Sequence, residues 1–448
     1  MTNIVRAFWV GFIVLSILWL AADPGVFGAT GIFQWRHFLV QYSGVLAIGC
    51  MSIAMILSLR PRWPERWLGG LDKMYRLHKW LGIGALVLSI SHWFFVNGVK
   101  WAVGWGFLTK PERGPRAPIE NPLEAFFTQL RNPAEFVGEW TFYAVVLLIA
   151  VSLSLIKIIP YRQFLRFHRF LPVAYLVLVF HSVTLAEFYY WLTPLGIVLA
   201  IMMTAGTYAA IISLMGRIGA KRCVQGTIAD LHSFPGVKVL RTTIDMGPGW
   251  PGHKAGQFAF ATSNPKEGAH PYTIASSWDA DAPQIAFFTK ALGDHTSRLE
   301  QTLKPGLPVT IEGPYGCFTF DDDQPVQIWI GAGIGITPFI AKMQHLAKDG
   351  TAATKTIHLF HSTAEVDDAA LQNLDEEARA ANIQLHVLIS ARDGYLTGDR
   401  IRQQVPEWPD TSFWFCGPTG FGDALRNDFA NRGVPVHKRF HQELFSMR

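Results

Sequence analysis

The chain has 448 residues, half of them hydrophobic, and a formal net charge of +5. This length exceeds what one domain usually needs. Many of the basic residues gather in short loops between apolar runs, a pattern that sets membrane orientation and does not point to nucleic-acid binding. The four cysteines are widely separated and form no CxxC pair, so neither a disulfide framework nor a cysteine-based zinc site is expected.

The first half of the chain, to about residue 216, is dominated by long apolar runs. Six candidate spans cover about 5–22, 36–59, 78–99, 138–159, 168–188 and 191–215. Each is close to the ~20 residues that cross a bilayer as a helix. The first run lacks a small-residue cleavage site, so we interpret it as a retained membrane helix rather than a cleaved signal peptide.

Orientation follows from the charged loops. The loops 60–77 and 157–169 and the segment after residue 216 are rich in lysine and arginine. With six spans these three regions share one side of the membrane, which the positive-inside rule identifies as the cytoplasm. We therefore expect a multi-pass protein of a bacterial inner membrane, in contact with lipid, with its soluble half in the cytoplasm and the 100–137 segment outside.

Two of the spans carry histidines in pairs. His78 and His92 lie at the start and middle of the third span, and His168 and His181 lie likewise in the fifth. A histidine inside a span is costly and suggests function, although a single one can simply bond to a neighbouring helix. Fourteen residues rise ~21 Å along a helix and return to within ~40° of the same face.

Such pairs on two helices would hold two stacked haems by bis-imidazole ligation. His78 and His168 would form the inner pair, and His92 and His181 the outer pair. The thirteen-residue spacing in the fifth span is about 140° out of phase on an ideal helix, but Pro172 lies between the two histidines and can distort the helix. Four histidines at matched depths favour haem ligation over four histidines that are bonded only to neighbouring helices.

The second half of the chain reads as a soluble protein with two patterns. Short strands with turn signals run from Gln225 to about Phe320 and predict a small antiparallel barrel. From Val326 onward, strands alternate with helical segments, which predicts a parallel α/β sheet.

Several short motifs stand in this half. The loop GAGIGITP, Gly331 to Pro338, suits a pyrophosphate at a helix N-terminus, although it also fits a plain strand-to-helix turn. The others are HPYTIASS from His270, KALGDHTS from Lys290, FCGP from Phe415 and FHQELF from Phe440. Taken singly, each of these is compatible with a structural detail.

Together the motifs and the paired histidines resemble the ferric reductase and NADPH oxidase superfamily over nearly the whole chain. The resemblance implies a multidomain protein with three parts. These are an all-α six-helix transmembrane domain with two b-type haems (1–218), an antiparallel β-barrel that binds FAD (219–322) and an α/β parallel-sheet domain that binds NAD(P)H (323–448). In that family the histidine spacings are also fourteen and thirteen.

The resemblance also implies roles for individual residues. Those implied for FAD are His270, Pro271, Tyr272, Thr273, Lys290 and Thr296. Those implied for the nicotinamide dinucleotide are Gly331, Gly333, Gly335, Thr337, Pro338, Gly417 and Pro418. Cys416 would lie near the nicotinamide, with a packed strand-end thiol as the alternative, and Phe445 would stack on the flavin. Arg392 would hold the 2′-phosphate of NADPH, with a bare surface arginine as the alternative, so NADPH is favoured over NADH only weakly.

These features predict a transmembrane oxidoreductase. It would pass electrons from cytosolic NAD(P)H through FAD and two haems to ferric iron or dioxygen on the outer face. An alternative is an electron-relay subunit that supplies a periplasmic partner protein or quinone. A third class, a haem-free transporter or sensor with a nucleotide-binding domain, would require the four histidines to be dispensable.

Overall fold

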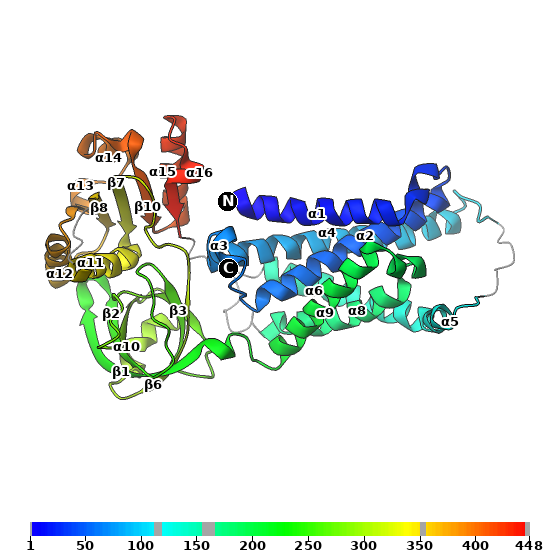
Figure 1. Ribbon diagram of the computed structural model, residues 1–448, viewed down its shortest axis with the longest axis horizontal. Helices are drawn as coiled ribbons and strands as arrows, with labels where there is room; N and C mark the ends of the chain where they lie inside the picture. Colours follow the sequence, from blue (N-terminus) through cyan, green and yellow to red (C-terminus); the bar gives the residue numbers. More distant parts are fainter. Residues whose placement is uncertain (1, 112–118, 155–165, 350–354, 444–448) are drawn as a thin grey trace. The chain divides into compact units, whose positions relative to one another are not determined.

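The computed structural model describes residues 2–111, 119–154, 166–349 and 355–443, and Figure 1 shows it as a ribbon. By its internal contacts the chain divides into two compact units. The first consists of Met1–Trp63 and Met74–Ile218, and the second of Pro64–Lys73 and Gly219–Met447. Part of the basic loop 157–169, which was used to predict the orientation and contains Lys157 and Arg162, lies outside the described residues.

The first unit is helical. Its long helices are α1 (Thr2–Ala22), α2 (Ile32–Ser58), α4 (Leu71–Gly104), α6 (Arg131–Ser154), α8 (Leu171–Leu185) and α9 (Pro194–Leu214). Six segments of the described chain, one in each of these helices, are long and apolar enough to cross a membrane. The fifth begins at Arg166, before α8 itself. The prediction of a six-helix, multi-pass membrane domain is confirmed.

The helix ends differ from the predicted spans. Helix α4 begins at Leu71, seven residues before the predicted start, and has 34 residues. At 1.5 Å per residue it is ~51 Å long, whereas the hydrocarbon core of a bilayer is ~30 Å thick. Hydropathy marks only the apolar part of a helix, so it cannot locate a helical end that contains charged residues such as Asp72 and Lys73.

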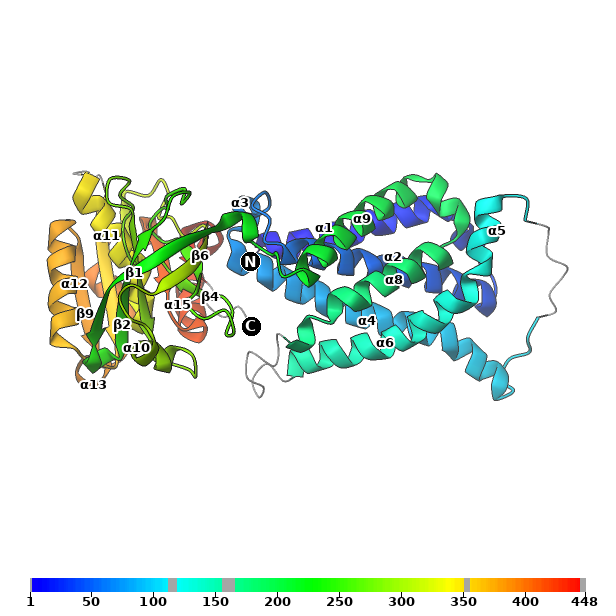
Figure 2. The same cartoon turned by 90° about the horizontal axis from the view of Figure 1, so that it is seen from below.

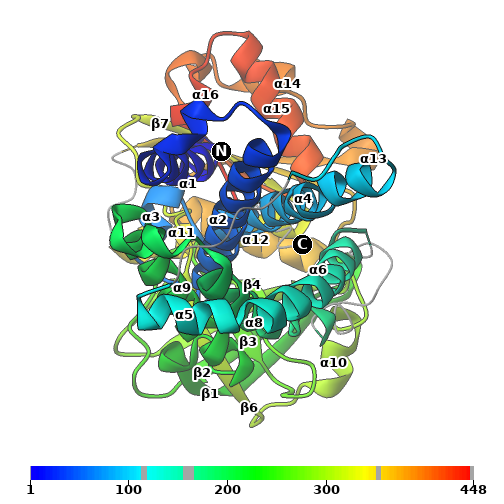
Figure 3. The ribbon, with the colours of Figure 1, turned by 90° about the vertical axis from the view of Figure 1, so that its right-hand side faces the viewer.

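Helices α1, α2, α8 and α9 pack around a shared core, seen from below in Figure 2 and nearly end-on in Figure 3. Tyr175 of α8 is fully buried there, and its hydroxyl forms a 2.8 Å hydrogen bond with Ser52 Oγ of α2. A methyl group at Gly206 of α9 would lie 2.1 Å from the Tyr175 hydroxyl. Small residues that admit a close neighbour are typical of helix packing in membranes.

The second unit contains two sheets. The first is antiparallel, in the order β4-β3-β6-β1-β2-β5. Its strands are β1 (Cys223–Phe234), β2 (Val239–Met246), β3 (Phe258–Thr262), β4 (His270–Thr273), β5 (Gln284–Lys290) and β6 (Pro308–Tyr315). An antiparallel bridge between Ile274, directly after β4, and Phe287 of β5 joins the two edges. The sheet therefore closes, and the predicted antiparallel barrel is confirmed.

The other sheet is parallel, in the order β11-β10-β7-β8-β9. Its strands are β7 (Val326–Ala332), β8 (Thr356–Thr363), β9 (Gln384–Ile389), β10 (Ser412–Cys416) and β11 (Phe440–Gln442). Helices α11 (Thr337–Asp349) and α12 (Asp368–Ala380) share one apolar core with the sheet, and α15 (Thr419–Asn431) shares another. Both faces are thus covered, as expected for a parallel sheet, and the predicted α/β domain is confirmed.

The short segment Pro64–Lys73, which follows α2 and includes the first three residues of α4, belongs to the second unit. It contains the one-turn helix α3 (Glu65–Leu68). The Glu65 carboxylate accepts a 2.7 Å hydrogen bond from the backbone N–H of Gly316, directly after β6.

Candidate functional site

The four membrane histidines lie in two pairs. The ring centres of His78 and His168 are 5.9 Å apart, and those of His92 and His181 are 6.2 Å apart. An iron bound axially by two imidazoles, at roughly 2 Å from each nitrogen, would separate the ring centres by roughly 6 Å. Both pairs therefore have the spacing that one haem iron between the rings requires.

Backbone carbonyls orient three of the four rings. The Nδ1 atoms of His78, His92 and His181 lie 2.9, 3.0 and 2.8 Å from the carbonyl oxygens of Ala54, Val40 and Ala134, respectively. A carbonyl only accepts, so each Nδ1 carries the proton and donates it. Each Nε2 then keeps its lone pair, which is the form that binds a metal, and the carbonyl fixes the ring plane.

The thirteen-residue spacing is accommodated by a break in the helix. His168 lies in a helical segment that ends at that residue, Arg169 and Phe170 form a turn, and α8 begins at Leu171 with Pro172 in its first turn. Proline is well tolerated there because its missing N–H has no helical partner at that position. The ideal helical rotation of 100° per residue therefore does not apply across the turn, so His168 can face His78.

Glycines make room for two of the rings. A methyl group at Gly138 of α6 would lie 2.0 Å from His181 Nδ1, and one at Gly44 of α2 would lie 3.3 Å from His92 Cε1. Helix α6 thus positions His181 of the outer pair in two ways. The Ala134 carbonyl accepts its hydrogen bond, and Gly138 leaves space for its ring.

The motif HPYT forms strand β4 in the barrel. The Tyr272 ring packs on Phe287, its hydroxyl lies 3.0 Å from His295 Nε2, and burial raises its pKa. Thr273 is buried, and its hydroxyl has no hydrogen-bond partner among the described residues. A buried polar group without a partner is costly, so this hydroxyl is available to a ligand such as the ribityl chain of a flavin.

Two other residues predicted to bind FAD have protein partners. Lys290 forms an ion pair with Glu365, which follows β8. The Thr296 hydroxyl oxygen accepts hydrogen bonds of 3.0 and 3.1 Å from the backbone N–H groups of Leu292 and Gly293. The Thr296 hydroxyl therefore stabilises the loop that contains it. Lys290 would have to break its ion pair with Glu365 before it could bind a phosphate.

The glycine loop lies at the point where the strand order of the parallel sheet reverses. Strands β8 and β9 follow on one side of β7, and β10 follows on the other. In open α/β sheets, ligands bind at the carboxyl ends of the strands beside such a reversal. Gly331, the next-to-last residue of β7, pairs in register with Cys416 at the end of β10.

The loop and the CGP motif are in direct contact. A methyl group at Gly335 would lie 2.2 Å from the carbonyl oxygen of Cys416, and one at Gly417 would lie 2.7 Å from Ala332 Cβ. Gly333 has a φ of +55°, which favours glycine. The buried Thr337 hydroxyl donates to the Ile334 carbonyl at 2.7 Å at the start of α11, where Pro338 follows. Two motifs about 80 residues apart are thus brought together at the carboxyl ends of β7 and β10, where ligands bind in open α/β sheets.

The structure gives less support to the roles predicted for the remaining residues. Cys416 is fully buried, and burial raises its thiol pKa well above the usual value, so it is not a thiolate at neutral pH. The Arg392 guanidinium is exposed and donates two hydrogen bonds to Asp393, at 2.9 and 3.0 Å. Phe445 lies outside the described residues.

Residues 43–179 match the family of the ferric reductase like transmembrane component. The membrane half is therefore similar to this family over most of its length. With its barrel and parallel sheet, the chain has the two-part architecture, a membrane part and a soluble part, that this resemblance implied. The matched segment includes three of the four paired histidines and ends before the fourth, His181.

Curated proteins of other organisms resemble parts of this chain. An NADPH oxidoreductase of Mycobacterium tuberculosis is 28% identical over 218 residues, which cover 46% of this chain and 56% of the relative. A flavohemoprotein of Oceanobacillus iheyensis is 23% identical over 189 residues, 39% of this chain and 46% of the relative. The chain thus spans about half the length of the curated relatives it matches.

Solved structures give a similar result. The FAD/NAD binding domain of nitric oxide dioxygenase from Vibrio cholerae aligns with a TM-score of 0.42 at 19% identity, covering 49% of this chain and 97% of that one. Ferredoxin-NADP+ reductase from Plasmodium falciparum aligns with a TM-score of 0.43 at 18% identity, covering 50% and 96%.

The sequence analysis did not identify Glu443. The residue directly follows β11, is buried beside Cys416, and has a carboxylate oxygen without a hydrogen-bond partner among the described residues. Burial raises its pKa well above the usual value. The signal was present in FHQELF, where an acidic residue stands next to a strand of a buried sheet, but only the aromatic residue of that motif was considered.

Proposed function

We propose that the protein passes electrons from cytosolic NAD(P)H through FAD and two b-type haems to an acceptor on the outer face, ferric iron or dioxygen. FAD accepts electrons in pairs and the haems carry them singly, so the cofactors supply the redox chemistry. The chain supplies binding, orientation and the separation of the sites from water.

The observation that carries the proposal is the double pairing of histidines. Each pair has the spacing of two axial ligands on one iron. A pair bonded only for packing would have no reason to keep Nε2 atoms available, whereas Nδ1 donation to a carbonyl, made by three of the four, is what haem ligation requires.

In the soluble module we propose that β4 holds the flavin. Tyr272 would contact the ring system, and the Thr273 hydroxyl would bond to the ribityl region. The backbone from Gly331 to Gly335, with Gly417 opposite, would hold the dinucleotide at the reversal of the parallel sheet. Cys416 and Glu443 would then flank the nicotinamide as neutral groups, since burial raises both of their pKa values.

The preference between NADPH and NADH depends on Arg392. Its charge is already matched by Asp393, so a 2′-phosphate would compete with that carboxylate. We therefore propose that both nucleotides serve, with only a small advantage for NADPH.

The order of the haems gives the proposal a direct test. The variants His78→Ala and His92→Ala each remove one ligand, the first from the inner pair and the second from the outer pair. In His92→Ala, anaerobic NADPH with FAD should still reduce the remaining haem, while reduction of an external ferric chelate stops. In His78→Ala, the remaining haem should be reduced by dithionite but only slowly by NADPH.

The two variants control for each other, because each loses one imidazole from the same helix. Equal NADPH reduction of the remaining haem in both variants would contradict the proposed order. Full ferric reduction in His92→Ala would contradict the outer haem as the exit. NADPH-dependent superoxide without a ferric chelate would identify dioxygen as the acceptor.

A further inference from the structure

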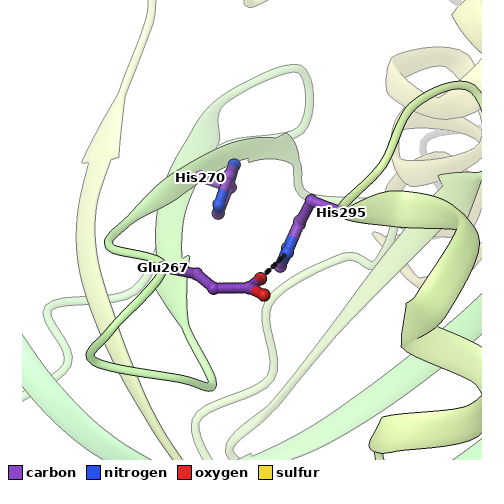
Figure 4. A group of neighbouring side chains, drawn as sticks. All are labelled: Glu267, His270 and His295. Carbon is purple, nitrogen blue, oxygen red and sulfur yellow. Dashed lines mark hydrogen bonds and ion pairs between the residues drawn. The ribbon is translucent and has the colours of Figure 1, made fainter. Parts of the chain in front are cut away.

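Three side chains of the barrel converge beside the proposed flavin strand. Glu267 comes from the turn between β3 and β4, His270 begins β4, and His295 precedes the 3-10 turn after β5. One ligand atom from each lies within 4.8 Å of the other two. Figure 4 shows the three side chains lying toward one another. No other such group of three was found in the described part of the chain.

The hydrogen bonds of His295 favour a proton or a cation beside Glu267. Its Nδ1 contacts a carboxylate oxygen of Glu267, and its Nε2 lies 3.0 Å from the Tyr272 hydroxyl. Two groups with lone pairs do not approach each other in this way unless a proton or a metal ion lies between them. In the metal-free protein, Nδ1 carries the proton and Nε2 accepts from the tyrosine.

A metal ion can replace that proton without loss of the second hydrogen bond. If Nδ1 binds a metal, Nε2 carries the proton and donates to the Tyr272 oxygen, because a phenol hydroxyl both donates and accepts. Metal-binding histidines usually have such a partner on the other ring nitrogen. Tyr272 therefore supports His295 in either state.

The other two ligands are suited to the same ion. The His295 hydrogen bond lowers the pKa of Glu267, so its carboxylate is ionised at neutral pH. Its other oxygen lies 3.4 Å from the Arg298 guanidinium, which holds the carboxylate in place. The rings of His270 and His295 are stacked, with centres 3.8 Å apart and planes 7° apart, so the two imidazoles are already close neighbours.

Binding of an ion requires movement of these side chains. Four ligands at 2.0–2.1 Å around Zn²⁺ lie roughly 3.4 Å from one another in a tetrahedron, and the present limit of 4.8 Å exceeds this by about 1.4 Å. The lone pair of an imidazole nitrogen lies in the ring plane, so one of the two stacked rings must also rotate out of the stack before both can bind the same ion. A site with three protein ligands leaves a fourth position for water.

We propose that Glu267, His270 and His295 form a binding site for a divalent transition-metal ion of the Zn²⁺ class. Two imidazoles and one carboxylate match the ligands that Zn²⁺ accepts, and hard cations such as Mg²⁺ and Ca²⁺ prefer all-oxygen sites. Metal binding at Nδ1 moves the proton of the neutral His295 ring to Nε2, so the imidazole stays neutral in both states.

The test uses the full-length holoprotein without a histidine tag. The protein is dialysed against buffered Zn²⁺, and zinc is counted per chain by mass spectrometry with haem and FAD counted in the same samples. We expect one zinc per chain, and at least an about tenfold weaker affinity in Glu267→Gln and in His295→Gln. The control is His232→Gln, since His232 is an exposed histidine of the same barrel.

Equal zinc affinity in the wild type and both site variants would overturn the proposal. If a variant fails to fold, zinc-edge X-ray absorption of the wild type decides instead. A nitrogen and oxygen shell with imidazole scattering would support the site, and a sulfur shell or absence of bound zinc would overturn it. These measurements need neither NADPH nor haem reduction, so their failure is distinguishable from failure of the proposed electron path.

Discussion

The space at Gly138 gives the sharpest test of the outer histidine pair. In Gly138→Ala, the new methyl group would lie 2.0 Å from His181 Nδ1 and 2.4 Å from its Cε1, whereas real contacts of this kind are not closer than 3.0 Å. The imidazole must therefore move by about 1.0 Å, the difference between 3.0 and 2.0 Å. That movement also stretches the 2.8 Å hydrogen bond to the Ala134 carbonyl.

The expected cost follows from these contacts. Overpacking of this size typically costs about 1–3 kcal/mol, and a weakened hydrogen bond costs about 1 kcal/mol. Together they give a penalty of about 2–4 kcal/mol, which corresponds to an about 30–700-fold loss of affinity. Because haem iron tolerates little change in its axial bond length, we expect this loss to fall on the outer haem.

The assay counts haem per chain in the purified variant. We expect a fall from two haems toward one, with the remaining haem still reduced by NADPH. Gly11→Ala in α1 is the control, because the added methyl group there would meet only Ile53 Cδ1 at 3.8 Å and the gain in helix propensity is the same. Two intact haems with unchanged spectra in Gly138→Ala would refute the assignment of His181 to a haem.

Three further predictions concern the soluble module. Gly335→Ala should abolish NADPH-driven flavin reduction while FAD and haem are retained, since its methyl group would lie 2.2 Å from a backbone oxygen. Gly420→Ala is the control, because its methyl group would have no atom within 4 Å. Equal rates of flavin reduction in the two variants, measured by stopped flow, would contradict the proposed dinucleotide site. Thr273→Val should weaken FAD binding by about 1 kcal/mol, or about fivefold, in a fluorescence titration; unchanged affinity would exclude its hydroxyl as a ligand. Because the raised pKa of Glu443 means that the folded state holds the proton more tightly, thermal stability should fall as pH rises above the usual pKa of glutamate, about 4.3. Glu443→Gln should flatten that fall, and parallel melting profiles of the two proteins would contradict a buried neutral carboxyl.

The sequence predicts those parts of the fold that depend on local pattern. Apolar runs mark lipid-embedded helices and alternation marks half-buried strands, so the six spans, the barrel and the parallel sheet were all predictable. The start of α4 at Leu71 was not, because the charged residues Asp72 and Lys73 lower the hydropathy of its first turn. The turn at Phe170 was suggested by Pro172, but the resulting direction of His168 depends on packing.

The site residues were predictable only where a motif carries them. The contact of Gly335 with Cys416 could be expected from the reversal of strand order. The pairing of Lys290 with Glu365 could not, because the two residues are 75 positions apart and meet through tertiary structure. The burial of Glu443 and the convergence of Glu267, His270 and His295 have the same origin, since each depends on elements that are brought together only in the fold.

The absorption spectrum of the purified protein, before and after anaerobic NADPH with added FAD, tests the central claim most directly. The account predicts a Soret band that corresponds to two haems per chain and sharp α and β bands after NADPH. A spectrum without haem would contradict the reading of the four histidines. Haem that dithionite reduces and NADPH does not would contradict the proposed path from the soluble module to the membrane half.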